Sequence, residues 1–413
     1  MIAGHPHGHG QPRKGIADFD FHQSPFVVIW ETTRACDLAC KHCRAEAVPH
    51  RNPLELSTDE AKRMLDRVRE FGPVVFVLSG GDFLKRPDAF ELIEYGFRLG
   101  LRMAVTPATT PLCTPETIDR LKASGISRLA ISLDGSCPEI HDEFRRVPGS
   151  FEWGMKILEH CRTIGLSTQV NTVFAKHNIG DFDNLAALMA KMGIVFWEVF
   201  FLVPMGRAKP DDVASAENFE LLFNKMYDLS KVAPFDLKAT AAPQYSRVLL
   251  QRQVEERRAG EREEAPDVLT GGLMFSTKDG IGRARSVNDG DGFMFISHTG
   301  EIMPSGFLPI PAGNVRTDDL VEVYRTSPVF SQLRDRSALK GKCGVCEYQK
   351  VCGGSRARAY AMTGDFLEAE PFCAYVPPRY AKMVEAGEAE PVEEYFARRT
   401  RSALPLAGAG IDG

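Results

Sequence analysis

The chain has 413 residues, of which 44% are hydrophobic and 25% are charged, and its formal net charge at pH 7 is −5. This is the composition of a soluble globular protein with one large and one smaller domain, and the slight acidic excess argues against a nucleic-acid partner. The chain contains no uninterrupted apolar run of membrane-spanning length and its N-terminus lacks a secretory signal, so we expect a cytoplasmic protein with no membrane partner.

The N-terminal half predicts an α/β domain. Residues 1–24 are polar, and we expect a disordered tail there rather than a metal site at His5, His7 and His9. Residues 25–235 alternate six β-rich runs with helical periodicity, which is typical of a parallel sheet with helical crossovers. The expected strands cover 26–30, 74–79, 101–106, 126–134, 166–174 and 194–203.

Helices are predicted between these strands. The first opens at Ser57 with a capping box completed by Glu60, and others are expected near 87–99, 114–124, 151–164 and 181–192. The periodicity alone allows either an open doubly wound sheet or a partial barrel. In both, ligands bind at the carboxyl ends of the strands.

The C-terminal half is predicted to be less regular. Residues 236–314 are interpreted as a bridging segment that ends in a hairpin over 293–304, with helices near 217–231 and 244–259 on either side of its start. Short helices around 319–335 lead into a cysteine-rich segment, so 315–385 is predicted to be a small domain. Residues 386–413 are expected to form a peripheral tail.

Seven of the ten cysteines fall into two clusters, which indicates metal ligation in a reduced compartment. The first cluster, Cys36, Cys40 and Cys43, forms a C-x3-C-x2-C array directly after the first predicted strand. Three thiolates can hold three irons of a cubane and leave the fourth iron free for a small molecule. A structural zinc site would need a fourth ligand, and the nearby His42 is expected to shield the cluster rather than bind it.

The array resembles the cluster motif of the radical S-adenosylmethionine (SAM) superfamily, in which His42 would replace an aromatic residue. Phe83 replaces the family's usual proline, and Thr106-Pro107-Ala108 stands where Thr-Asn-Gly is usual. The resemblance implies a partial (β/α)6 barrel in which a [4Fe–4S] cluster binds SAM, cleaves it reductively and yields a 5′-deoxyadenosyl radical. It also implies SAM contacts at the strand ends, from Gly80, Gly81, Asp82, Ser132, Asp134, Asn171, Leu202 and Val203.

The second cluster consists of Cys343, Cys346, Cys352 and Cys373. Four thiolates can saturate a zinc ion or a [4Fe–4S] cluster, and the spacing does not choose between them. The segment is similar to the SPASM auxiliary-cluster domain or its shortened twitch form. Ser305 stands where the full form has a cysteine, so the resemblance implies one fully ligated auxiliary [4Fe–4S] cluster, used for electron transfer or architecture.

Three cysteines and several basic residues remain. Cys113 and Cys137 are expected to be packed or partly exposed loop thiols near the predicted site, and Cys161 is expected to lie in the core. Basic residues near strand ends are candidates for pairing with carboxylates of SAM or substrate, although most charges of this kind are simply solvated. These are Arg145, Arg146, Arg207 and Lys209.

Over residues 25–380 the chain resembles SPASM/twitch enzymes of the alternative haem pathway. The resemblance implies a tetrapyrrole substrate, hydrogen abstraction from its propionate or acetate side chains, and a low-potential electron donor such as flavodoxin or ferredoxin. One alternative is a maturase of a ribosomally made peptide, although the 24 residues before the first strand leave no room for a leader-binding domain. The other is a non-catalytic zinc or iron–sulfur scaffold.

Overall fold

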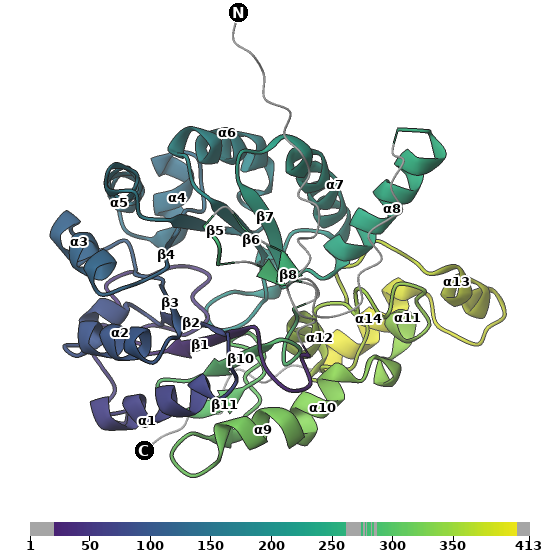
Figure 1. Cartoon of the computed structure of the whole chain (residues 1–413). Coiled ribbons are helices and arrows are strands. Elements are labelled where there is room, and N and C mark those ends of the chain that lie inside the picture. The colour runs from purple at the N-terminus through teal and green to yellow at the C-terminus, as the bar shows by residue number, and fades with distance from the viewer. Residues whose placement is uncertain are drawn as a thin grey trace, which may run out of the picture.

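The computed structural model describes residues 20–261, 274–275, 277, 279–281, 283–284 and 287–402 (Figure 1). The histidines at positions 5, 7 and 9 lie outside these residues. The core is a ten-stranded sheet in the order β12-β11-β10-β1-β2-β3-β4-β5-β6-β7. Within the described ranges, no helix combines the length and apolarity that crossing a membrane requires.

The six predicted strands are confirmed, and they pair in parallel in chain order. A seventh parallel strand, β7 (Asp236–Thr240), pairs with β6 and was not predicted. Its sequence, DLKAT, buries only Leu237, and so it lacks the apolar signature of a buried strand. The predicted strands are β1 (Val27–Glu31), β2 (Val75–Ser79), β3 (Arg102–Val105), β4 (Arg128–Ser132), β5 (Thr168–Phe174) and β6 (Phe196–Phe201).

The crossover helices were also predicted, apart from the short α4 (Pro138–Arg145). The capping box of α1 is present, because the Ser57 hydroxyl accepts from the Glu60 N–H and the Glu60 carboxylate accepts from the Ser57 N–H. Left-handed Gly165 and Gly193 end α5 and α6. The helices are α1 (Thr58–Arg69), α2 (Ala89–Arg98), α3 (Pro115–Ala123), α5 (Ser150–Ile164), α6 (Phe182–Met192), α7 (Ala216–Val232) and α8 (Gln244–Arg258).

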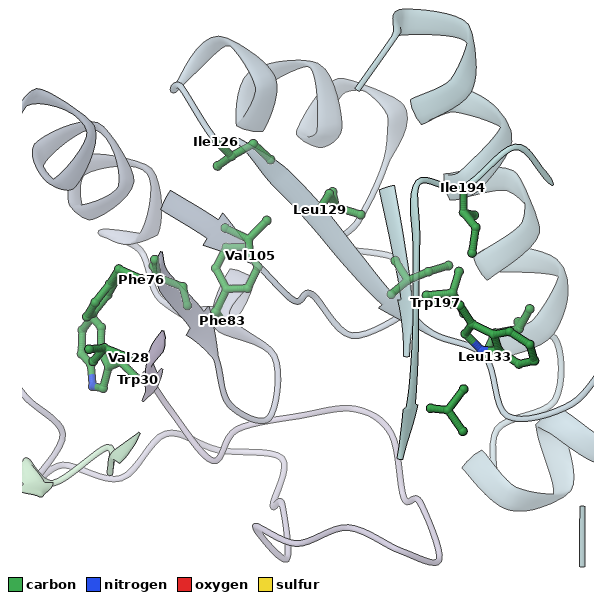
Figure 2. Close-up of a cluster of buried hydrophobic side chains, with 14 of the residues drawn as sticks. Val28, Trp30, Phe76, Phe83, Val105, Ile126, Leu129, Leu133, Ile194 and Trp197 are labelled. Atoms are coloured by element: carbon green, nitrogen blue, oxygen red, sulfur yellow. The ribbon is translucent and has the colours of Figure 1, made fainter. Parts of the chain in front are cut away.

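The main core lies between the sheet and these helices. Alternate strand residues such as Val28, Trp30 and Trp197 are completely buried in it (Figure 2). The intervening residues therefore face the other, concave side of the sheet. At the amino ends of β3 and β4 this side is covered by Asp279 and Ile281, since Arg128 forms a bidentate ion pair with Asp279 at 2.7 Å and Arg102 donates to the Ile281 carbonyl. The carboxyl ends of the strands are where the cysteine loop lies.

The predicted hairpin is confirmed as β10 (Phe293–Ile296) and β11 (Glu301–Met303), and β10 pairs in parallel with β1. The hairpin therefore extends the main sheet, which ends at β12 (Gly313–Asn314). A separate small sheet pairs β8 (Met274–Phe275) with β9 (Arg283–Ala284). The remaining helices are α9 (Leu320–Thr326), α10 (Pro328–Arg334), α11 (Gly341–Gly344), α12 (Arg356–Thr363), α13 (Pro378–Glu385) and α14 (Val392–Ser402).

The segment that carries the second cysteine set is fixed to the carboxyl end of β6. Arg358 of α12 is fully buried, pairs with the equally buried Glu370 at 3.0 Å, and donates to the Phe201 carbonyl at 3.2 Å. At the other end of the chain, Tyr395 of α14 is buried and donates to Glu368. Part of the predicted tail thus packs against this segment.

Replacing Arg358 with Met should destabilise the protein. The substitution leaves the Glu370 carboxylate buried without its ion partner, and breaking a buried pair in this way costs roughly 3–5 kcal/mol. Anaerobic thermal unfolding should show a clearly lower melting temperature. As a control, Arg398→Met on α14 removes a guanidinium that is 64% exposed, and it should change the melting temperature little. Equal melting temperatures for the two variants would contradict this account.

Candidate active site

The first cysteine cluster lies on the loop that follows β1. Cys36 and Cys40 are buried and Cys43 is partly exposed. Burial raises the pKa of Cys36 to about 12, so a thiolate at this position requires positive charge nearby, as a metal supplies. The sulfurs have N–H donors, from the Leu38 amide to Cys36, the Ala47 amide to Cys43 and the Arg145 guanidinium to Cys40, at 3.4, 3.4 and 3.5 Å. Such donors stabilise thiolate charge, and the loop therefore fits an iron–sulfur cluster.

The turn after β2 supports the cysteine loop through main-chain contacts. The Gly81 N–H donates to the Thr33 carbonyl and the Asp82 N–H to the Ala35 carbonyl, both at 2.7 Å. A Cβ atom at Gly80 would lie 2.5 Å from the Thr33 oxygen, and one at Gly81 would lie 2.4 Å from the Ala35 oxygen. Glycine is thus required at both positions because the two backbones touch. The SAM contact inferred from sequence remains a prediction, alongside this structural role.

Asp82 uses its side chain within the protein. The carboxylate is fully buried, accepts from the Thr110 hydroxyl at 2.8 Å and from the Leu84 N–H at 3.2 Å, and burial raises its pKa. It therefore ties the glycine turn to the loop after β3.

Asp134 and Arg145 form a buried ion pair behind Cys40. Arg145 Nη2 lies 2.5 Å from Asp134 Oδ2, and the same guanidinium donates to Cys40 Sγ. Burial alone would raise the pKa of Asp134, but the Arg145 charge holds it below its usual range. The Val173 N–H donates to the other carboxylate oxygen at 2.8 Å. Arg145 is thus held by a protein carboxylate and a thiol, and its pairing with a ligand carboxylate stays a prediction.

His42 packs where a shielding residue is expected. Its ring stacks on Phe144 with centroids 4.0 Å apart, and Phe144 in turn contacts His177. Burial lowers the pKa of His42 to about 3, so the ring is neutral at physiological pH.

Ser132 and Asn171 are direct neighbours in the register of β4 and β5, and both are partly exposed on the concave side. The Asn171 side chain accepts a hydrogen bond from Gln169 at 2.7 Å. Leu202 and Val203, by contrast, are buried. Leu202 belongs to the main core, and Val203 packs with Leu308, Leu333 and Ala357. Their side chains are used in packing, so a ligand contact there would involve the main chain.

Arg207 holds the cysteine loop from the side of β6. Its guanidinium donates to the carbonyls of Cys40 and Ala47, and its backbone N–H donates to the Cys43 carbonyl at 3.1 Å. Gly206 precedes it with a left-handed φ of 59°, and a Cβ there would lie 2.4 Å from the Cys43 oxygen. Arg207 therefore positions the loop, and its contact with a ligand stays a prediction.

The other two basic candidates lie in turns, and their pairing with a ligand stays a prediction. Arg146 is the left-handed residue that ends α4. The Lys209 N–H donates to the Asp212 carboxylate at 2.8 Å, in the turn after β6.

A charged and aromatic group on the concave side was not found from sequence. Glu31, at the carboxyl end of β1, is fully buried and contacts Arg44 at 2.7 Å, Arg34 at 3.2 Å and His298 at 3.0 Å. Burial would raise the pKa of Glu31, but the charge of Arg44 and the hydrogen bond with His298 lower it to about 2. Arg44 also lies over the Phe295 ring, 4.6 Å from its centroid. The sequence gives no local signal for the contact with His298, which lies 267 positions from Glu31.

The second cysteine set is gathered on the loops around α11 and α12. Cys343, Cys346, Cys352 and Cys373 line one pocket. Backbone N–H groups of Glu370 and Gly354 donate to Cys343 and Cys352, each at 3.4 Å. In the described residues, no group of three or more His, Cys, Asp or Glu side chains is placed to hold a single metal ion. A cubane does not require such convergence, because each thiolate binds a different iron atom.

The three remaining cysteines lie outside both sets. Cys113 and Cys161 are buried in the main core, as expected for Cys161, and the partly exposed Cys137 precedes α4.

Comparison with known proteins identifies the family. A model of the Radical SAM superfamily matches residues 30–189. The chain is also 43% identical over 355 residues to the AdoMet-dependent heme synthase of Nitratidesulfovibrio vulgaris, across 86% of this chain and 93% of the relative. The chain belongs to the radical SAM superfamily. It is therefore an enzyme whose cofactors are a [4Fe–4S] cluster and SAM.

Two further proteins resemble the chain at lower identity. Mycofactocin maturase MftC of Mycobacterium ulcerans is 29% identical over 363 residues, across 85% of this chain and 88% of the relative. The crystal structure of Streptococcus suis SuiB bound to S-adenosylmethionine has a TM-score of 0.64 at 16% identity, and the match covers 86% of this chain and 78% of SuiB. This likeness confirms the radical SAM fold predicted from the sequence, in its partial-barrel form.

The Gly81→Ala variant should lose function at the first cluster. The new Cβ cannot coexist with the Ala35 carbonyl, so the cysteine loop must move, and a displacement of this kind can cost about 100-fold in rate. We expect less iron at the first site and strongly reduced 5′-deoxyadenosine formation. Gly180→Ala is the matched control, because its added Cβ has no atom within 4 Å and its φ is not left-handed. Normal iron content and activity in Gly81→Ala would show that the main-chain contact is dispensable.

Proposed function

We propose that the enzyme acts on a tetrapyrrole and converts propionate side chains to vinyl groups in a haem-forming step. The supporting observation is the 43% identity to an AdoMet-dependent heme synthase over 86% of this chain and 93% of that protein. The geometry agrees with a radical SAM reaction, because the three-cysteine loop lies at the carboxyl end of β1 beside the glycine turn.

When bound, the cluster and SAM supply a 5′-deoxyadenosyl radical that can take a hydrogen atom from an unactivated carbon. The chain's task is to hold both and to orient the substrate. We propose that Cys36, Cys40 and Cys43 ligate the cluster and that the SAM contacts come from the strand-end residues. These are Gly80, Gly81 and Asp82 through the main chain, Ser132 and Asn171 on the concave side, and Leu202 and Val203 through their backbone. Asp134 acts indirectly in this proposal, through Arg145 and Cys40.

The concave side has features that suit a flat ring with carboxylates. Arg44 and Phe295 are in contact at the carboxyl ends of β1 and β10, and Phe200 of β6 lies 6.3 Å from Phe307 between ring centroids. Lys238 of β7 adds a further cation, paired with Glu198 at 3.0 Å. Aromatic faces can stack on the macrocycle and cations can pair with its propionates.

The proposed reaction balances as follows for each propionate. One hydrogen atom leaves the β-carbon, the bond to the carboxylate carbon breaks to release carbon dioxide, and one electron leaves the substrate as the vinyl double bond forms. An electron acceptor is therefore needed in addition to the low-potential donor that starts SAM cleavage. A flavodoxin or ferredoxin is proposed as that donor, in the cytoplasm and without a nucleic-acid or membrane partner.

The second cysteine set is proposed to hold an auxiliary [4Fe–4S] cluster. Its thiols receive backbone N–H groups in the same way as those of the first set, which supports a charged cluster in the pocket.

A peptide maturase is the second candidate, because the chain is 29% identical to a mycofactocin maturase. The higher identity to a heme synthase favours the tetrapyrrole. A non-catalytic scaffold does not agree with membership of an enzyme family.

Anaerobically reconstituted enzyme with SAM, dithionite and an iron coproporphyrin should form 5′-deoxyadenosine and a product that has lost carbon dioxide and two hydrogens per propionate, detected by mass spectrometry. Cys40→Ala should abolish both, because the first cluster loses one of its three ligands. Cys137→Ala is the control, as this thiol belongs to neither set, and it should retain activity. SAM cleavage without any porphyrin product, together with modification of a co-encoded peptide, would favour the maturase instead.

A further inference from the structure

The first turn of α8 lines the pocket of the second cysteine set. Three residues separate the end of β7 from the start of α8, so α8 belongs to the barrel side of the molecule and lies far in sequence from the four cysteines. Gln244 and Arg247 are three positions apart on this helix, which places them on one face, and both line the pocket together with the cysteines. Their exposed fractions are 0% and 2%.

These two side chains hold polar atoms without partners. Among the described residues, neither amide atom of Gln244 has a hydrogen-bond partner, and Arg247 Nε has none. Buried polar groups are normally satisfied, and each exception indicates a missing partner. A [4Fe–4S] cluster would offer its inorganic sulfides and thiolate sulfurs as acceptors, in the pocket that both side chains line.

The guanidinium of Arg247 is held in place by its other nitrogens. Nη1 donates to Glu220 at 2.8 Å and to Gln251 at 2.6 Å, and Nη2 donates to Glu220. The guanidinium carbon lies 5.0 Å from the centroid of the Tyr375 ring, and its charge interacts with Cys352 and Cys373. Arg247 is thus a fixed cation whose Nε–H has no partner among the described residues.

The charge of the cluster in its oxidised and reduced states determines how neighbouring groups change its reduction potential. Four thiolates around an oxidised cubane carry a net charge of about −2, and reduction adds one negative charge. A nearby cation and N–H donors stabilise the more negative state more strongly. They therefore shift the reduction potential upward.

We infer that Gln244 and Arg247 donate hydrogen bonds to the auxiliary cluster and raise its reduction potential, so that the barrel side of the chain tunes a cluster ligated by the C-terminal segment. The inference rests on the proposed auxiliary cluster and is independent of the tetrapyrrole substrate.

The test is an EPR-monitored redox titration of reconstituted full-length enzyme. The signal of the first cluster is distinguished by its change on addition of SAM, which leaves the fully ligated second cluster unchanged. Gln244→Met removes the amide at nearly constant volume, and Arg247→Met removes the donor and the charge. Both variants should keep their iron content and shift the midpoint potential of the second cluster to more negative values, with the larger shift in Arg247→Met.

Arg252→Met is the matched control. Arg252 lies on the same helix but pairs with Asn224 and Asp228, away from the cysteines, so its loss should leave the potential unchanged. Resonance Raman spectra in heavy water give a second measure, because the deuterium shift of the Fe–S modes should be smaller in Gln244→Met than in the unmodified enzyme.

Unchanged potentials in both variants with intact clusters would overturn the inference, as would a shift of equal size in Arg252→Met. Zinc at the second site of the unmodified enzyme would also overturn it, since no redox signal could then be tuned. If Gln244→Met loses the cluster, Arg247→Met alone tests the inference. The inference is then refuted if the second cluster of Arg247→Met has the same midpoint potential as in the unmodified enzyme. The midpoint potentials and Raman shifts do not depend on porphyrin turnover, so an enzyme that does not convert a porphyrin would contradict the proposed function and leave this inference standing.

Discussion

The arrangement of the first site depends on main-chain contact between the cysteine loop and the turns at neighbouring strand ends. Gly81 and Asp82 donate to the loop at Thr33 and Ala35, and Gly206 approaches it at Cys43. A Cβ atom at Gly81 or Gly206 would overlap the carbonyl oxygens of the loop, so glycine is required for steric reasons at the carboxyl ends of β2 and β6. A cluster that leaves one iron open to SAM needs three thiolates fixed without a fourth, and a loop supported by backbone on two sides meets that need.

Two arginine side chains also hold the cysteine loop in place. Arg145 joins Cys40 to the buried Asp134, and Arg207 donates to the carbonyls of the loop itself. Both arginines lie near strand ends, where sequence alone suggests a role in ligand binding. In this structure a buried carboxylate and the carbonyls of the cysteine loop bind these guanidinium groups, so both arginines have a structural role besides the predicted one.

Much of the sheet could be predicted because its strands bury one face completely. Val28, Trp30 and Trp197 repeat the alternation that identifies a strand, and the cysteine spacing identified the first site independently of any strand. β7 was missed because Lys238 and Thr240 face the concave side and bind Glu198, which leaves Leu237 as its single buried residue. The parallel pairing of β10 with β1 was also out of reach, since it joins residues more than 260 positions apart.

The same edge of the sheet organises both cysteine sets. The first follows β1, and the second is attached to β6 through Arg358 and to the end of β7 through the first turn of α8. Parallel strands bring all their carboxyl ends to one side, so segments separated by 300 residues in sequence are attached to the same edge of the sheet. The unpaired polar atoms of Gln244 lie at the junction between the two parts.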